Sequence, residues 1–119
     1  MSKKVLIFDD DIDILEVCTI ALKSAGFEVE GLTNCDNVLD KLDKHQPDVV
    51  LLDNKIPATG GIVASQTIKS SQHHKTIPVI FFSASSNVEK LASEALADFY
   101  IEKPFDLTTL IDAVKKASR

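Results

Sequence analysis

The chain has 119 residues, which is the length of one domain at roughly 100–200 residues per domain. Hydrophobic residues make up 45% and charged residues 26%, as in globular domains, so the composition excludes disorder, collagen and a disulfide-dense miniprotein. The net charge of -5 disfavours direct binding to nucleic acid or to an anionic membrane, because both need a cationic surface. We therefore expect residues 1–119 to form a single domain.

The first half of the chain alternates between apolar segments and helical periodicity. Residues 5–8 are apolar without polar alternation, which predicts a strand buried on both faces of a sheet. Apolar side chains then recur at intervals of three and four over 14–25, which predicts a helix that Gly26 ends. Residues 27–32 are a weaker strand candidate, and a second helical repeat follows over 38–42.

The second half of the chain continues this alternation. Residues 49–52 and 78–82 resemble the first apolar segment and predict strands, while 99–101 is a weaker strand candidate. A helix is predicted after each of these strands, over residues 62–71, 88–95 and 107–114. We expect the first of these helices to fray at its polar end, and Asp106 to cap the last one.

Strand and helix thus alternate five times, which predicts an α/β fold with a parallel sheet covered by helices on both faces. Cys18 and Cys35 lie neither in a CxxC motif nor at zinc-site spacing, so we expect two reduced thiols. The sequence shows neither a signal peptide nor an apolar run near the roughly twenty residues of a membrane span. These features favour a cytoplasmic protein.

Polar side chains follow four of the predicted strands, and ligands of open α/β sheets bind outside the carboxyl ends of strands. These residues are Asp9, Asp10 and Asp11; Asp53; Ser83; and Glu102 with Lys103. Each has an ordinary explanation when taken alone, such as a helix cap for Asp11 or a turn for Asp53. Two carboxylates about 4 Å apart repel by roughly 4 kcal/mol at an effective dielectric near 20, so such a cluster needs a cation. An all-oxygen site favours Mg²⁺ over zinc.

At these residues the sequence resembles the response-regulator receiver domain of two-component signalling. The resemblance covers essentially the whole chain, through the segments VLIFDDD (5–11), DVVLLDNKIP (48–57), VIFFSA (79–84) and FYIEKPF (99–105). It implies a CheY-like (βα)5 fold with the flavodoxin-like strand order 2-1-3-4-5. It also implies that Asp53 accepts a phosphoryl group from the phosphohistidine of a sensor histidine kinase or a histidine phosphotransfer protein.

The resemblance assigns roles to the other strand-end residues as well. It implies a Mg²⁺ ion held by Asp9, Asp10, Asp53 and the backbone carbonyl of Lys55. It implies that Ser83 and Lys103 bind phosphoryl oxygens, that Tyr100 is the switch aromatic, and that the bond before Pro104 is cis. The output would be a changed surface that an unidentified downstream protein reads, without direct contact to nucleic acid or membrane.

The chemistry of the residues agrees with these roles. An ionised carboxylate is a usable nucleophile toward phosphorus, and phosphoryl transfer needs cations around the equatorial oxygens. Ser83 replaces the more common Thr and keeps the hydroxyl. The side chain of Lys55 would either contact the phosphoryl group or point into solvent while its carbonyl serves the metal. The three histidines lie away from the strand ends, and we expect a surface position for His45, His73 and His74.

Two other classes of protein compete with this interpretation. IFDDDID also resembles the start of a haloacid-dehalogenase-like phosphatase, with Asp9 as nucleophile and Asp11 as acid/base. However, the Gly-Thr expected after Asp11 and the late paired acidic motif are absent. The other alternative is a receiver-like interaction module without phosphoryl turnover. As a receiver, the chain would catalyse its own phosphorylation and dephosphorylation at Asp53 without being a conventional enzyme.

Overall fold

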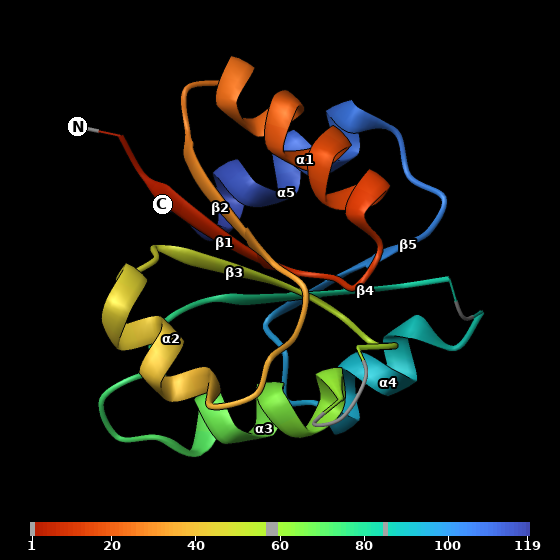
Figure 1. Ribbon diagram of the computed structural model, residues 1–119. Coiled ribbons are helices and arrows are strands. Elements are labelled where there is room, and N and C mark those ends of the chain that lie inside the picture. Colours follow the sequence, from red (N-terminus) through yellow and green to blue (C-terminus); the bar gives the residue numbers. More distant parts are fainter. Residues whose placement is uncertain (1, 57–59, 85) are drawn as a thin grey trace.

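The computed structural model describes residues 2–56, 60–84 and 86–119, so Pro57, the last residue of one motif, lies outside the described part. Strands and helices alternate along the chain (Figure 1). The elements are β1 (Lys4–Phe8), α1 (Ile12–Ser24), β2 (Glu28–Leu32), α2 (Val38–His45), β3 (Val49–Asp53), α3 (Gly61–Ser70), β4 (Val79–Ser83), α4 (Val88–Glu94), β5 (Phe99–Glu102) and α5 (Leu107–Ala117). The predicted βα alternation is thereby confirmed.

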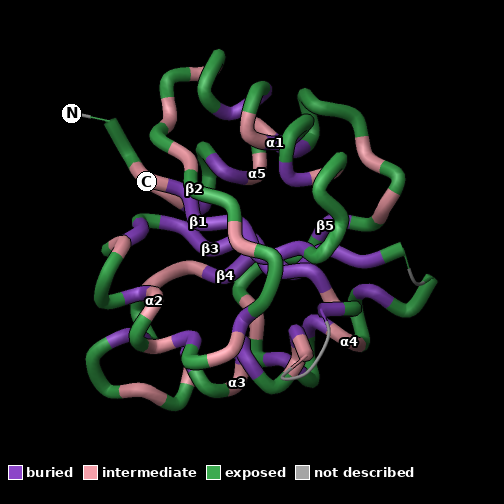
Figure 2. Tube along the Cα trace, in the orientation of Figure 1, coloured by how far each residue is buried: buried purple, intermediate pink, exposed green. Residues whose placement is uncertain are grey.

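The five strands form one parallel sheet in the order β2-β1-β3-β4-β5, as predicted. Helices α1 and α5 cover one face, and α2, α3 and α4 cover the other (Figure 1). The sheet's central strands are buried along their length, whereas its edges and the outer helix surfaces are exposed (Figure 2). This pattern agrees with apolar segments that lack polar alternation.

Alternation along the central strands divides the core into two layers. Val49 and Leu51 pack in the cluster beneath α1 and α5, whereas Val50 and Leu52 pack in the cluster beneath α2 and α3. Successive strand residues point to opposite faces, so Asp53, the next residue in the first series, belongs to the α1–α5 face. The Asp53 carboxylate, at the end of β3, therefore lies on the α1–α5 side of the sheet.

Several predicted boundaries were off by a few residues. The fourth strand includes Ser83, which we placed just after it, and α5 extends to Ala117. Helix α3 ends at Ser70, one residue before the predicted end, and the backbone N–H of Ser71 donates to the Ile68 carbonyl at 3.2 Å. Fraying of this polar end stays a prediction. The predicted cap of α5 is confirmed, because the Asp106 carboxylate accepts a hydrogen bond from the backbone N–H of Thr109 at 2.8 Å.

The surface position predicted for His74 was wrong. Its side chain is buried, with Nε2 2.7 Å from Asp43 Oδ1 and Nδ1 2.6 Å from the hydroxyl of Ser71. Both ring nitrogens thus have polar partners, which allows an imidazole to be buried. This contact joins α2 to the loop before β4. It lies at the amino ends of the strands, whereas Asp53 lies at the carboxyl end of β3. His73 is exposed as predicted, and His45 is half-buried.

Cys18 and Cys35 are free thiols, as the sequence predicted, and both are buried. Burial raises the pKa of Cys18 to about 11 and also raises the pKa of Cys35. Across the described ranges, no helix combines the length and the apolar character needed to cross a bilayer.

Helices α1 and α4 end in the same backbone motif but with different residues. In each, the residue with positive φ past the helix end is followed by a residue whose N–H bonds back into the last turn, which is a Schellman motif. These closing bonds run from Phe27 to Leu22 and from Ala97 to Ala92, each 3.0 Å long. The left-handed residue is Gly26, with φ 98°, after α1, and Leu96, with φ 61°, after α4.

We expect Leu96→Gly to stabilise the fold by about 1 kcal/mol, because glycine adopts this backbone conformation without the Cβ penalty. The Leu96 side chain is 55% exposed, so little packing would be lost. Urea denaturation of both proteins measures the difference. Leu96→Ala is the control: it removes the same side chain but keeps a Cβ, and equal stabilisation by both variants would contradict the explanation.

Candidate functional site

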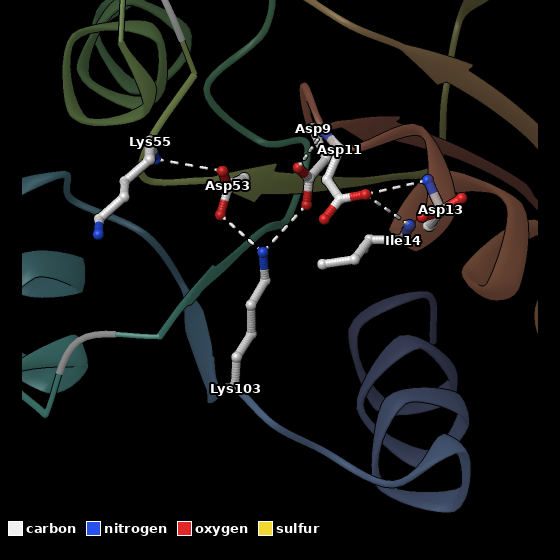
Figure 3. Close-up of polar contacts among 7 residues, drawn as sticks. All are labelled: Asp9, Asp11, Asp13, Ile14, Asp53, Lys55 and Lys103. Carbon is white, nitrogen blue, oxygen red and sulfur yellow. Dashed lines mark hydrogen bonds and ion pairs between the residues drawn. The ribbon is translucent and has the colours of Figure 1, made fainter.

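Three charged side chains converge at the carboxyl edge of the sheet. Asp9 follows β1, Asp53 ends β3 and Lys103 follows β5 (Figure 3). The Lys103 ammonium donates to Asp9 Oδ2 at 3.0 Å and to Asp53 Oδ1 at 2.9 Å. Because parallel strands end at the same edge, residues 94 and 50 positions away from Lys103 reach the same ammonium. The structure thus brings together three residues that the sequence predicted for the site.

Burial and neighbouring charges shift the pKa values of Asp9 and Lys103. Asp9 is 1% exposed and Asp53 5% exposed. Burial raises the pKa of Asp9 and the charge of Asp53 raises it further, against the lowering effect of hydrogen bonds from Asp11 and Lys103. Burial alone would lower the pKa of Lys103, but its hydrogen bonds to Asp53 and Asp9, together with the negative charges of these carboxylates, outweigh that effect and raise the pKa. The ammonium is therefore held in its charged form between two carboxylates.

The acidic residues form a set of oxygen donors that could hold a metal ion. Carboxylate oxygens of Asp9, Asp10 and Asp53 lie within 4.8 Å of one another. Asp9 and Asp53 are buried, whereas Asp10 is exposed and open to water. Hard oxygen donors with access to water suit a hard divalent cation. The donor chemistry therefore fits the cation that the sequence led us to expect.

Asp11 has a different role from its two acidic neighbours. Its carboxylate accepts hydrogen bonds from the backbone of Asp13 at 3.0 Å and of Ile14 at 3.4 Å, so it caps α1 (Figure 3). Its own N–H donates to Asp9 Oδ1 at 2.9 Å. Of the two explanations that the sequence left open for Asp11, the structure therefore supports the helix cap.

The backbone beyond β3 also surrounds Asp53. The N–H of Lys55 donates to Asp53 Oδ2 at 3.2 Å, and Figure 3 shows the Lys55 side chain extending away from that carboxylate. On the other side, Gly61 at the start of α3 packs against the Asp53 backbone. A Cβ atom on Gly61 would lie 2.1 Å from the Asp53 carbonyl oxygen. Both neighbours constrain Asp53 through their backbone.

Ser83 and Tyr100, the other two predicted site residues, lie on β4 and β5. Ser83 ends β4 and is buried, and its carbonyl accepts a hydrogen bond from the Lys103 N–H at 2.8 Å. Tyr100 lies on the edge strand β5 and is 48% exposed. Glu102, which the sequence also placed at this edge, is exposed. The peptide bond between Lys103 and Pro104 is cis, as the resemblance implied.

Sequence analysis missed one residue of this site, Phe82. The Lys103 Nζ atom lies over its ring, 4.6 Å from the ring centroid. The apolar segment over 78–82 predicted only a buried strand. Phe82 pairs with Asp53 in the register between β3 and β4. Knowledge of this register would have placed Phe82 beside the site.

Comparison with known proteins relates this chain to one family. The model of the response regulator receiver domain family matches residues 5–115. The phosphate regulon transcriptional regulatory protein PhoB of Pseudomonas aeruginosa is 31% identical over all of this chain and 53% of its own length. The transcriptional regulatory protein PrrA of Mycobacterium tuberculosis is 32% identical over 99% of this chain and 51% of its own. The chain thus spans about half the length of these relatives.

Solved structures show the same architecture. A putative response regulator from Chloroflexus aurantiacus superposes with a TM-score of 0.93 at 26% identity, covering 99% of this chain and 98% of its own. The chemotaxis response regulator CheY4 of Vibrio cholerae has a TM-score of 0.89 at 26% identity, covering 98% and 99%.

These matches extend over the strand ends that carry Asp9, Asp53 and Lys103. They favour the receiver interpretation over the haloacid-dehalogenase-like alternative, in which Asp11 would need to act as acid/base instead of capping α1. Receiver domains take phosphate from histidine kinases. The chain belongs to the response regulator receiver domain family, the phosphoacceptors of two-component systems.

Proposed function

We propose that Asp53 is the phosphoacceptor and that Asp9, Asp10, Asp53 and the Lys55 carbonyl hold Mg²⁺ beside it. The observation that carries this proposal is the Lys103 ammonium, which joins the buried carboxylates Asp9 and Asp53 at the carboxyl edge of the sheet. The donor would be the phosphohistidine of a sensor histidine kinase or of a histidine phosphotransfer protein.

The chemistry follows from the charges around Asp53. A carboxylate oxygen forms a bond to phosphorus as the bond from phosphorus to the donor imidazole nitrogen breaks, and the imidazole leaves with that electron pair. Lys103 and the Ser83 hydroxyl would hold phosphoryl oxygens on the product. When bound, Mg²⁺ would spread the charge that develops on those oxygens. The chain would in this way promote its own phosphorylation and its later hydrolysis at Asp53.

The setting of this reaction is also part of the proposal. We place residues 1–119 in one domain that acts in the cytoplasm, since free, buried thiols suit a reducing compartment. The output would be a contact with a downstream protein. The net charge of -5 argues against direct contact of this domain with nucleic acid.

Incubation with acetyl phosphate and Mg²⁺ tests the central step. We expect a hydroxylamine-sensitive phosphoryl adduct, mapped by peptide mass spectrometry to Asp53, and saturable binding of beryllofluoride. The absence of both results, or an adduct on another residue, would overturn the proposal. If neither result were obtained, the receiver-like interaction module would become the favoured interpretation.

The metal site predicts different effects for two neighbouring aspartates. Asp10→Ala should weaken Mg²⁺ binding by roughly tenfold or more, because even the outer partners of metal ligands have effects of that size. Asp11→Ala should leave the affinity almost unchanged and instead lower the free energy of unfolding by about 1 kcal/mol, since it removes the cap of α1. Calorimetric titration and urea denaturation measure the two quantities.

The affinity for Mg²⁺ should also fall as the pH decreases toward the carboxylate range, because the ligands must be deprotonated. The raised pKa of Asp9 moves the start of this loss to a higher pH than an ordinary aspartate would. Equal losses of affinity in Asp10→Ala and Asp11→Ala would count against the ligand assignment.

Ser83 should couple phosphorylation to Tyr100. The acyl phosphate adds about one negative charge and new acceptor oxygens at Asp53, and an inward movement of the Ser83 hydroxyl would open space toward β5. We expect beryllofluoride to shift the NMR signals around Tyr100 in the wild type, and to shift them far less in Ser83→Ala. Ser83→Thr keeps a hydroxyl and should respond like the wild type. The same response in all three proteins would exclude this coupling.

A further inference from the structure

The Phe82 ring lies directly beneath the ammonium that joins the two carboxylates. Phe82 is 1% exposed and belongs to the core cluster on the α1–α5 face. Its register partner on β3 is Asp53, so the ring and the carboxylate lie side by side on one face of the sheet. Lys103 reaches across both of them from the end of β5, with Nζ 4.6 Å from the ring centroid.

The Phe82 ring also packs against a second aromatic ring. Phe105, just past the Lys103–Pro104 bond, meets Phe82 edge to face, with 6.2 Å between centroids and an interplanar angle of 75°. Edge-to-face packing is a preferred geometry for aromatic pairs. The orientation of the Phe82 face toward Lys103 is therefore supported by a neighbouring ring.

A π face is well suited to this position. The ammonium has three N–H donors, and its contacts to Asp9 and Asp53 already use two acceptors. The negative face of an aromatic ring attracts a cation without offering a strong acceptor, and this attraction strengthens when the pair is shielded from water. A hydroxyl or carboxylate in the same place would compete for the donors that the phosphoryl oxygens need.

We propose that Phe82 is a positioning residue for phosphoryl transfer, which holds the Lys103 ammonium beside Asp53 through the face of its ring. This inference rests on the proposed function, since it assigns Lys103 to the phosphoryl group. It differs from a simple packing role, in which only the size and shape of the ring matter.

Graded fluorination separates the two roles, because fluorine withdraws charge from the ring face and changes its shape little. We would replace Phe82 with 4-fluoro- and 3,4,5-trifluorophenylalanine and measure the affinity for beryllofluoride with Mg²⁺. The affinity should fall with each step, by roughly three- to tenfold for the trifluoro ring. Phe81 is the matched control: it is fully buried one residue earlier, in the cluster around α4, and its fluorination should have little effect.

A second measurement does not depend on phosphoryl chemistry. Protons at the end of the Lys103 side chain should show upfield NMR shifts from the ring beneath them, and Phe82→Leu should abolish those shifts in the free protein. An unchanged Lys103 spectrum in Phe82→Leu, a flat affinity series at Phe82, or an equal decline at Phe81 would overturn the inference. If the wild type formed neither an acyl phosphate nor a beryllofluoride complex, the proposed function would fail, and the Lys103 shifts would still decide whether Phe82 holds the ammonium.

Discussion

Asp53→Asn is expected to abolish phosphorylation by acetyl phosphate while leaving the fold intact. The neutral amide is not the nucleophile that the reaction needs, so no acyl phosphate can form at this position. The change in stability should stay within about 1 kcal/mol, because two effects oppose each other. The variant loses the ion pair between Asp53 and Lys103 but also loses the repulsion between Asp53 and Asp9, and Lys103 keeps its contact with Asp9 at 3.0 Å.

Two measurements check this expectation, namely the hydroxylamine-sensitive adduct and the urea midpoint. Asp112→Asn is a suitable control, because it makes the same change at an exposed residue in the middle of α5. It should be phosphorylated at the wild-type rate. A hydroxylamine-sensitive adduct that persists in Asp53→Asn at the wild-type level would show that the acceptor is another residue.

Much of the fold could be predicted because its signals are local. Four-residue apolar segments such as 5–8 and 49–52 predict buried strands, and helical periodicity lies between them. Strand ends also locate the site, because a parallel sheet gathers them at one edge. The sequence therefore predicts that Asp9, Asp53 and Lys103 lie at the site, and in the structure the Lys103 ammonium contacts both carboxylates.

Other features depend on contacts that a single sequence does not encode in its periodicity. The sequence predicts a surface position for His74, because nothing near it in the chain indicates that its ring nitrogen would contact Asp43 on α2. Phe82 was assigned to the core, because its relation to Lys103 depends on the register between β3 and β4 and on the course of β5. Leu96 adopts a left-handed conformation that favours glycine, so its residue type gave no warning of the turn.

Gly61→Ala should damage both the fold and the reaction. Gly61 is buried at the first position of α3, and an added Cβ would lie 2.1 Å from the carbonyl oxygen of Asp53 and 2.9 Å from its carbonyl carbon. Both atoms belong to the backbone of β3, so no side chain can rotate away to relieve the clash. We expect a loss of about 3 kcal/mol in the free energy of unfolding, at the upper end for overpacked sites.

The same clash should slow phosphorylation, because the backbone that must move to relieve it belongs to Asp53, the proposed nucleophile. Misplacement of a reacting group by about 1 Å can reduce a rate by roughly 100-fold, so we expect a fall of at least roughly tenfold with acetyl phosphate. Gly26→Ala is the control. Gly26 has φ 98° and open space around its missing Cβ, far from the site, so it should cost about 1 kcal/mol and leave the rate unchanged. If both variants lost the same stability and kept the same rate, the close contact between α3 and Asp53 would not constrain the acceptor.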